Sequence, residues 1–162
     1  MEIRLAKQKD IPRLIDLLLQ VGQVHHELRP DIFPPRTLKY DEEALVDLLE
    51  DAKICPVFVA VEDDYVVGYC FCALREYQGS AVVGVRRELY IDDLCVDENR
   101  RGQGIASKLY RHVMNYAKER GCKAVTLNVW CGNDNAMRFY EKMGMRPRYI
   151  TMEASLEETN AD

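Results

Sequence analysis

The chain has 162 residues, 48% of them hydrophobic and 30% charged, which is the composition of one globular domain with a substantial core. Its formal net charge of −5 argues against nucleic acid or an anionic membrane as the main partner. No apolar run approaches the roughly 20 residues that cross a membrane, and the N-terminal residues lack a signal-peptide pattern, so we expect a cytoplasmic protein.

The first part of the chain predicts a strand followed by two helices. A short strand is expected from Glu2 to Ala6, and then a helix from Gln8 to about Leu28, with apolar residues at helical spacing. The prolines of the segment Arg29 to Pro35 cannot continue that helix. A second helix is therefore predicted separately, from Asp41 to Glu50.

Short apolar runs predict five further strands in the rest of the chain. They run from Val57 to Val61, Val66 to Leu74, Leu89 to Val96, Ala124 to Trp130 and near Arg148 to Leu156. A central helix follows the third of these strands, and another helix is predicted from Asn133 to Met143. No repeat or linker divides the chain, so we expect one domain over residues 1–162 that ends in a solvated tail from Glu157 to Asp162.

The turn between the strand that ends at Val96 and the central helix is predicted to bind an anion. The first backbone N–H groups of a helix lack intrahelical partners and the helix dipole is positive there, so a phosphate can accept several hydrogen bonds. Gly102 and Gly104 have no Cβ to block close approach or to disfavour a positive φ angle. Arg100 and Arg101 add donors and positive charge.

Two familiar phosphate-binding loops do not fit this turn. No Gly-Lys-Ser/Thr follows, as a P-loop requires, and Ser107 occupies the third glycine position of the dinucleotide-binding motif. The sequence Arg101-x-x-Gly104-x-Ala106 instead resembles the Arg/Gln-x-x-Gly-x-Gly/Ala pyrophosphate signature of the GNAT N-acetyltransferase superfamily.

A second segment supports the same resemblance. Residues Asn133 to Met145 are similar to the family's Asn-x-x-Ala-x-x-Phe-Tyr-Glu-Lys-x-Gly-Phe, with Met145 in place of the usual Phe. The resemblance implies a mixed α/β, GNAT-like fold, in which a strongly twisted, mostly antiparallel sheet of roughly six to seven strands is flanked by about four helices. Two central strands, one of them with a bulge, are expected to splay apart and hold the cosubstrate between them.

The resemblance further implies that acetyl-CoA is the cosubstrate and that no metal takes part. Its pantetheine arm would pair with exposed backbone of the central strand, much as an added strand would, and its pyrophosphate would lie on the glycine turn. The residues implied in binding it are Leu94, Cys95, Val96, Arg101, Gly102, Gln103, Gly104, Ile105, Ala106, Ser107, Asn133, Ala136 and Tyr140.

The chemistry implied is attack of a neutral amine on a thioester, which needs an acceptor for the amine's proton and a donor for the thiolate leaving group. Asp92 and Asp93 are candidate proton acceptors, of which at most one should face the amine, because adjacent strand residues point to opposite faces. Similarity to the acidic pair of polyamine acetyltransferases favours Asp92, with Glu88 as a weaker alternative. Tyr140 resembles the tyrosine that protonates the coenzyme A thiolate in many relatives.

The sequence leaves the acceptor amine open. The interpretation we favour is acetyl transfer to a primary amine of a small molecule, such as a polyamine, an aminoglycoside or an amino-acid derivative. The alternative acceptor is a protein or peptide, through its N-terminus or a lysine. A second alternative is a non-catalytic acyl-CoA sensor, which would keep the glycine turn but need neither Asp92 nor Tyr140. Because relatives are commonly homodimers, a homodimer is a further expectation.

Overall fold

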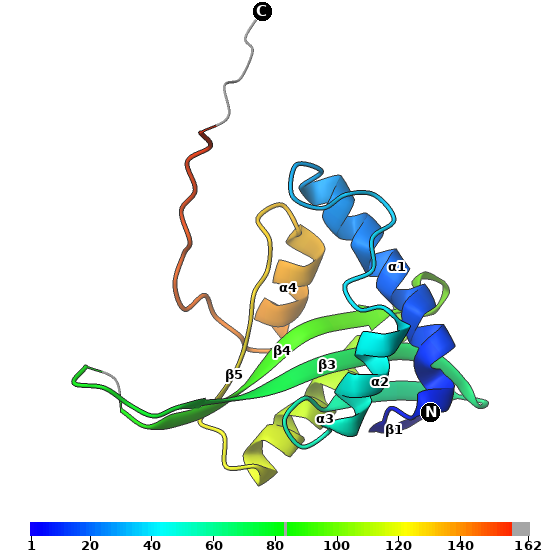
Figure 1. Cartoon of the computed structure of the whole chain (residues 1–162), viewed down its shortest axis with the longest axis horizontal. Coiled ribbons are helices and arrows are strands. Elements are labelled where there is room, and N and C mark those ends of the chain that lie inside the picture. Colours follow the sequence, from blue (N-terminus) through cyan, green and yellow to red (C-terminus); the bar gives the residue numbers. More distant parts are fainter. Residues whose placement is uncertain (83, 157–162) are drawn as a thin grey trace, which may run out of the picture.

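Five strands form one twisted sheet in the computed structural model, which describes residues 1–82 and 84–156 (Figure 1). Their bounds are β1 Glu2–Leu5, β2 Val57–Glu62, β3 Tyr65–Tyr77, β4 Arg86–Val96 and β5 Ala124–Leu127. The strands lie in chain order across the sheet; β1 to β4 pair antiparallel, and β5 pairs parallel to β4. The predicted mixed α/β class and mostly antiparallel sheet are therefore confirmed.

Four α-helices of the described residues cover the sheet, in agreement with the prediction. They are α1 Ile11–Leu28, α2 Glu42–Glu50, α3 Ile105–Glu119 and α4 Asp134–Lys142. Asp41 caps α2 and Asn133 caps α4, each by accepting a hydrogen bond from the backbone N–H three residues on. Helices α1 and α2 pack on one face and α3 on the other, since the adjacent β2 residues Phe58 and Val59 belong to different buried clusters. None of the described helices is long and apolar enough to cross a membrane.

The sheet has five strands in the described residues, so the prediction of six to seven strands is wrong. The segment Arg148 to Leu156, predicted as the last strand, is extended but pairs with none of the five strands (Figure 1). Its apolar residues do alternate, yet Ile150, Met152 and Leu156 are 78%, 87% and 96% exposed. Alternating apolar and polar residues form a strand only where the segment can pair with a neighbouring strand and bury its apolar face in a core. The predicted tail from Glu157 to Asp162 lies outside the described residues.

Strands β4 and β5 part about half-way along β4. They pair only where Glu88 to Ile91 lie beside Ala124 to Leu127. Strand β4 continues to Val96, so the stretch from Asp92 to Val96 faces no described strand on that side. The chain leaves β5 and enters α4, which lies beside the parted strands (Figure 1). The parting of β4 and β5 agrees with the predicted splay, but β5 is the edge strand of the described sheet and not a central one.

Candidate active site

A one-residue bulge in β4 sets the position of the two candidate carboxylates. Phe71 of β3 is paired with Asp93 of β4, but the next residue, Cys72, is paired with Ile91, so Asp92 is an extra residue. An extra residue shifts the side-chain alternation beyond it. Asp92 and Asp93 therefore both lie on the face that α1 and α2 cover, and the expectation that these neighbours point to opposite faces is wrong.

Two tyrosine hydroxyl groups hold these carboxylates. The Tyr69 hydroxyl donates to Asp93 Oδ2 at 2.8 Å, and the Tyr40 hydroxyl donates to Asp92 Oδ2 at 2.5 Å. Both tyrosine rings contact Phe71, whose ring centroid is 4.8 Å from that of Tyr69 and 5.4 Å from that of Tyr40. The three aromatic rings thus form an apolar support beside the carboxylate pair.

Sequence reasoning missed both tyrosines. Tyr40 lies just before α2, and nothing in its local sequence ties it to a carboxylate 52 residues later. Tyr69 could have been found, because a tyrosine inside the apolar run from Val66 to Leu74 is expected to be buried, and its hydroxyl group then needs a partner.

Asp93 is the more buried of the two carboxylates. Burial is the largest influence on it and raises the pKa of its carboxyl group to about 6, and the neighbouring charge of Asp92 acts in the same direction. The Tyr69 hydroxyl and the positive charge of Lys39 oppose this rise in the pKa. A carboxyl group with this pKa is mostly ionised at neutral pH and still accepts a proton readily, which suits a general base.

Asp92 is in direct contact with a cation. Nζ of Lys39, in the loop between α1 and α2, lies 2.9 Å from Asp92 Oδ1 and donates a hydrogen bond of 3.2 Å to the Asp92 backbone oxygen. The other carboxylate oxygen of Asp92 accepts the hydrogen bond from Tyr40. Both side-chain oxygens of Asp92 therefore have partners within the chain.

Glu88, the alternative candidate for the base, is also occupied. It is buried and forms ion pairs with Arg86 and with Arg148, whose Nη1 lies 3.0 Å from both of its carboxylate oxygens. In the part of the chain that the structure describes, Asp93 is the carboxylate of the three candidates without a direct ion pair. Within that part, no group of three or more His, Cys, Asp or Glu side chains is arranged to hold a metal ion.

The glycine turn has the open backbone that a phosphate needs. Gly102 and Gly104 both have a φ angle of +77°, in the left-handed region, and Gly104 is the N-cap of the 15-residue helix α3. A Cβ at either position would meet no described heavy atom within 4 Å, so the space beside the turn is open to a ligand. Arg101 Nε donates to the backbone oxygen of Val96 at 3.3 Å, which places this side chain at the end of β4.

A buried carboxylate fixes the chain where it enters the turn. Asp97 accepts a hydrogen bond of 2.9 Å from the backbone N–H of Asn99 and forms an ion pair with Arg13 of α1. Arg13 also donates to the backbone oxygen of Val66 at 3.1 Å. The turn is thus tied to α1 and β3, which limits its movement relative to β4.

Tyr140 and Tyr69 lie on opposite faces of the sheet. It packs with the α3 cluster, and its ring centroid is 6.3 Å from that of Tyr110 and 5.0 Å from that of Phe139. Burial is the main cause that raises the pKa of its hydroxyl group above the ordinary tyrosine range, and the charge of Asp93 acts in the same direction. The Tyr140 hydroxyl group is therefore protonated at neutral pH.

The other residues predicted to bind the cosubstrate border the parted strands. The stretch Leu94 to Val96 lies on the unpaired part of β4. Cys95 Sγ lies 3.6 Å from the backbone oxygen of Leu17 in α1, so only the backbone of Cys95 can face a ligand between the strands. Ile105 is the first residue of α3; its side chain is buried in the core cluster, so it likewise offers only its backbone. The remaining residues are exposed or half-buried on the turn, α3 and α4, namely Gln103, Ala106, Ser107, Asn133 and Ala136.

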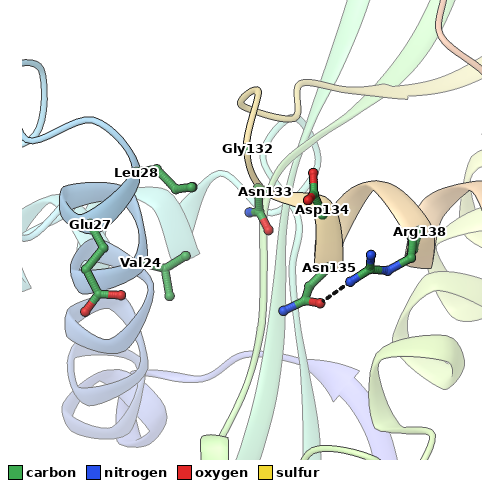
Figure 2. A pocket seen from close by; sticks show the side chains of 8 residues that line it. All are labelled: Val24, Glu27, Leu28, Gly132, Asn133, Asp134, Asn135 and Arg138. Carbon is green, nitrogen blue, oxygen red and sulfur yellow. Dashed lines mark hydrogen bonds between the residues drawn. The ribbon is translucent and has the colours of Figure 1, made fainter.

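Two adjoining cavities, of about 340 and 450 Å³, run between α1 and the elements after β4. Val24 and Glu27 of α1 line both of them. The first cavity reaches the start of α4 (Figure 2), where Asn135 accepts a hydrogen bond of 2.8 Å from Arg138. The second cavity reaches Arg101 of the glycine turn. Together the cavities connect the glycine turn with the N-terminus of α4.

Comparison with known proteins assigns the chain to a family. Residues 21–145 match the model of the acetyltransferase (GNAT) family, and the chain therefore belongs to this family. The resemblance carried by the glycine turn and by the segment from Asn133 to Met145 is thus confirmed.

Individual relatives agree with this assignment. N-alpha-acetyltransferase 30 of Schizosaccharomyces pombe is 34% identical over 87 residues, 54% of this chain and 55% of that protein, so the chain spans about half of its length. Thialysine N-epsilon-acetyltransferase of Mus musculus is 29% identical over 143 residues, 88% of this chain and 81% of that protein. The X-ray structure of a tetramutant of the BH1408 protein from Bacillus halodurans is 31% identical, with a TM-score of 0.91 over 96% of this chain and 100% of that one.

Proposed function

We propose that the chain is an N-acetyltransferase that moves an acetyl group from acetyl-CoA directly to a primary amine of a small molecule. The observation that carries the proposal is the carboxylate pair Asp92 and Asp93 at the β4 bulge, at the start of the stretch of β4 that has no described partner on the β5 side. One strand thus offers both a proton acceptor and an open edge for the cosubstrate. Family membership supports the reaction class, and the name of the Mus musculus relative supports a small acceptor.

The glycine turn and the open edge of β4 would hold acetyl-CoA, which supplies the acetyl thioester. The positive φ angles and the free space beside Gly102 and Gly104 fit a pyrophosphate bound by the backbone N–H groups up to Ser107, with charge from Arg101. The pantetheine arm would lie along the backbone from Leu94 to Val96. The side of the pantetheine arm that faces away from β4 would contact Asn133, which caps α4, and Ala136 and Tyr140 of α4.

Asp93 is the proton acceptor in this proposal. Similarity to relatives favours Asp92, but Asp92 is bound by Lys39 and Tyr40, whereas Asp93 combines burial with a pKa of about 6. The charge of Asp92 would instead attract a cationic amine to the site. Tyr140, on the other side of β4, would donate a proton to the departing thiolate.

Release of free thiol from acetyl-CoA, measured with a panel of amines, tests the proposed reaction. We expect at least one small primary amine to raise the rate of thiol release above that with acetyl-CoA alone, and peptides with free N-termini to leave it unchanged. A preference for the peptides would move the acceptor to protein or peptide amines. Binding of acetyl-CoA without turnover of any amine would make the chain an acyl-CoA sensor instead.

Replacing Gly104 with Val should raise the dissociation constant of acetyl-CoA by about 10- to 100-fold, because a β-branched residue at a positive φ angle is strained by about 1–3 kcal/mol and its side chain would fill the space beside the turn. Gln103→Ala is the matched control and should bind nearly as well as the wild type, since the proposed ligands are backbone groups. Calorimetric titration of acetyl-CoA into variants shown to be folded gives both constants. Equal affinity in Gly104→Val and the wild type would remove this turn from the binding site.

A further inference from the structure

We propose that the chain acetylates its own Lys39, so that this side chain is a modification site on the acceptor side of the carboxylate pair. The inference rests on the proposed acetyl transfer, because it uses the same acetyl donor and the same proton acceptor. Lys39 lies in the loop between α1 and α2, next to Tyr40, whose hydroxyl is bound to Asp92. The fold itself therefore brings a primary amine to the site.

The ammonium group of Lys39 is held in the way that an acceptor amine would be held. Its Nζ lies 2.9 Å from Asp92 Oδ1 and 3.2 Å from the Asp92 backbone oxygen, and it is 5.7 Å from the centroid of the Tyr40 ring. A carboxylate, a carbonyl oxygen and an aromatic face are groups that together recognise a primary ammonium ion. Asp93 is the next residue of β4 after Asp92, so the proposed base adjoins the carboxylate that holds the amine.

Among the described lysines, Lys39 alone forms an ion pair with either carboxylate. Lys9 pairs with Asp64 instead, at 4.0 Å. Lys118 is exposed in the last turn of α3, on the opposite face of the sheet. A reaction directed by the carboxylate pair would thus select Lys39, whereas unspecific chemical acetylation would modify exposed lysines in general.

The step balances without a further reactant. A proton leaves the Lys39 ammonium group for the Asp93 carboxylate, and the neutral amine attacks the thioester carbonyl carbon. A C–N bond forms and the C–S bond breaks, with no change in oxidation state. As the C–S bond breaks, the thiolate takes a proton from Tyr140, and the nitrogen releases its second proton, which restores the Tyr140 hydroxyl through solvent. Asp93 passes the first proton to solvent, so the products are free coenzyme A, Nε-acetyl-Lys39 and one proton. Because the acetylated side chain has no charge, its ion pair with Asp92 is lost and Asp92 becomes available to an incoming cationic amine.

The test is incubation of the whole chain with acetyl-CoA and no acceptor amine, followed by intact-mass measurement and peptide mapping. We expect a gain of one acetyl group, mapped to Lys39 and absent in Lys39→Arg. Lys118→Arg is the matched control and should be modified like the wild type. Asp93→Asn should acetylate Lys39 at least about 100-fold more slowly, since general-base catalysis contributes about that factor or more.

An isotope-labelled Asp93→Asn chain, mixed with unlabelled wild type, tests whether the transfer is intramolecular. We expect its Lys39 to stay unmodified while the wild type is acetylated; equal acetylation of both chains would overturn transfer within one molecule. Acetyl groups spread over many lysines, or the same yield on urea-unfolded chain, would overturn the role of the site. A chain that acetylates free amines but not Lys39 overturns this inference alone, and one that acetylates neither overturns the proposed function as well.

Discussion

Replacing Tyr140 with Phe is expected to lower kcat by about 10²- to 10⁴-fold, because the hydroxyl group that we propose protonates the departing thiolate is lost while the ring remains. The ring contacts with Tyr110 and Phe139 stay in place. The melting temperature and the acetyl-CoA dissociation constant should therefore change little. The measurement is thiol release with an established acceptor amine, at saturating substrates and under conditions where chemistry limits the rate.

Tyr110→Phe is the matched control for this experiment. Tyr110 is a buried tyrosine of α3 that contacts Tyr140, and no chemical role is assigned to its hydroxyl group. Its removal should change kcat by no more than a small factor. A similar loss in both variants would point to the polarity of the cluster, and wild-type turnover in Tyr140→Phe would mean that another group or water protonates the thiolate.

Replacing Asp93 with Asn should lower kcat/KM for a basic amine by about 10²- to 10⁴-fold with little change in acetyl-CoA affinity. The amide cannot accept the amine's proton, although it can still accept the hydrogen bond from the Tyr69 hydroxyl. In the wild type, kcat/KM should rise with pH through about 6, because Asp93 must be ionised to act as a base. The same rise in the activity that remains in Asp93→Asn would assign this pKa to another group.

The raised pKa of Asp93 also affects stability: activity should rise as the pH increases through about 6, whereas the free energy of unfolding should fall. The folded chain holds this proton more tightly than the unfolded chain, whose carboxyl group has a pKa near 3.8. The wild type therefore loses stability as pH rises from about 4 to about 6, and the loss is complete above that range. Because two pKa units correspond to roughly 3 kcal/mol, Asp93→Asn should gain up to roughly 3 kcal/mol in free energy of unfolding near pH 8 and nothing near pH 4. Denaturant unfolding at the two pH values measures this difference.

Asp92→Asn separates the roles of the two neighbouring carboxylates. It removes the negative charge beside Lys39 and leaves the contact between Asp93 and Tyr69 intact. We expect a higher KM for a cationic amine and a smaller effect on kcat than in Asp93→Asn. If Asp92→Asn alone loses activity, Asp92 is the base, as similarity to polyamine acetyltransferases indicates.

The elements that the sequence predicted correctly are those whose signals are local. The glycine turn is one example, since two glycines, two arginines and the start of an amphipathic helix lie within a few residues of Gly104. The starts of α2 and α4 are others, because their caps Asp41 and Asn133 each act on a backbone N–H only three residues away. Helical spacing and strand alternation are also properties of neighbouring residues, so most element bounds agree with the prediction to within a few residues.

The features that sequence reasoning missed depend on which segments become neighbours. The resemblance implied a bulge in the central strand, but its position at Asp92 is defined only by the pairing of β4 with β3, so the expectation of opposite faces for Asp92 and Asp93 is wrong. The contacts of Lys39 and Tyr40 with Asp92 cross from a loop to a strand far along the chain. The segment from Arg148 to Leu156 has the alternation of a strand without a partner, because the pattern does not say whether a sheet edge is near.

Because β5 pairs with β4 over only a short stretch, we expect the β5 side of the site to be more mobile than the β3–β4 side. Four residue pairs, from Glu88 with Ala124 to Ile91 with Leu127, hold β5 to the sheet, whereas ten pairs join β3 and β4. Tyr140 lies in α4, which follows this short edge strand, so we expect the backbone amides of β5 and α4 to exchange with solvent sooner than those around Asp93. A ligand bound across both strands would join them more firmly, so the separation between the proposed acid Tyr140 and the proposed base Asp93 would depend on the bound cosubstrate as well as on the fold.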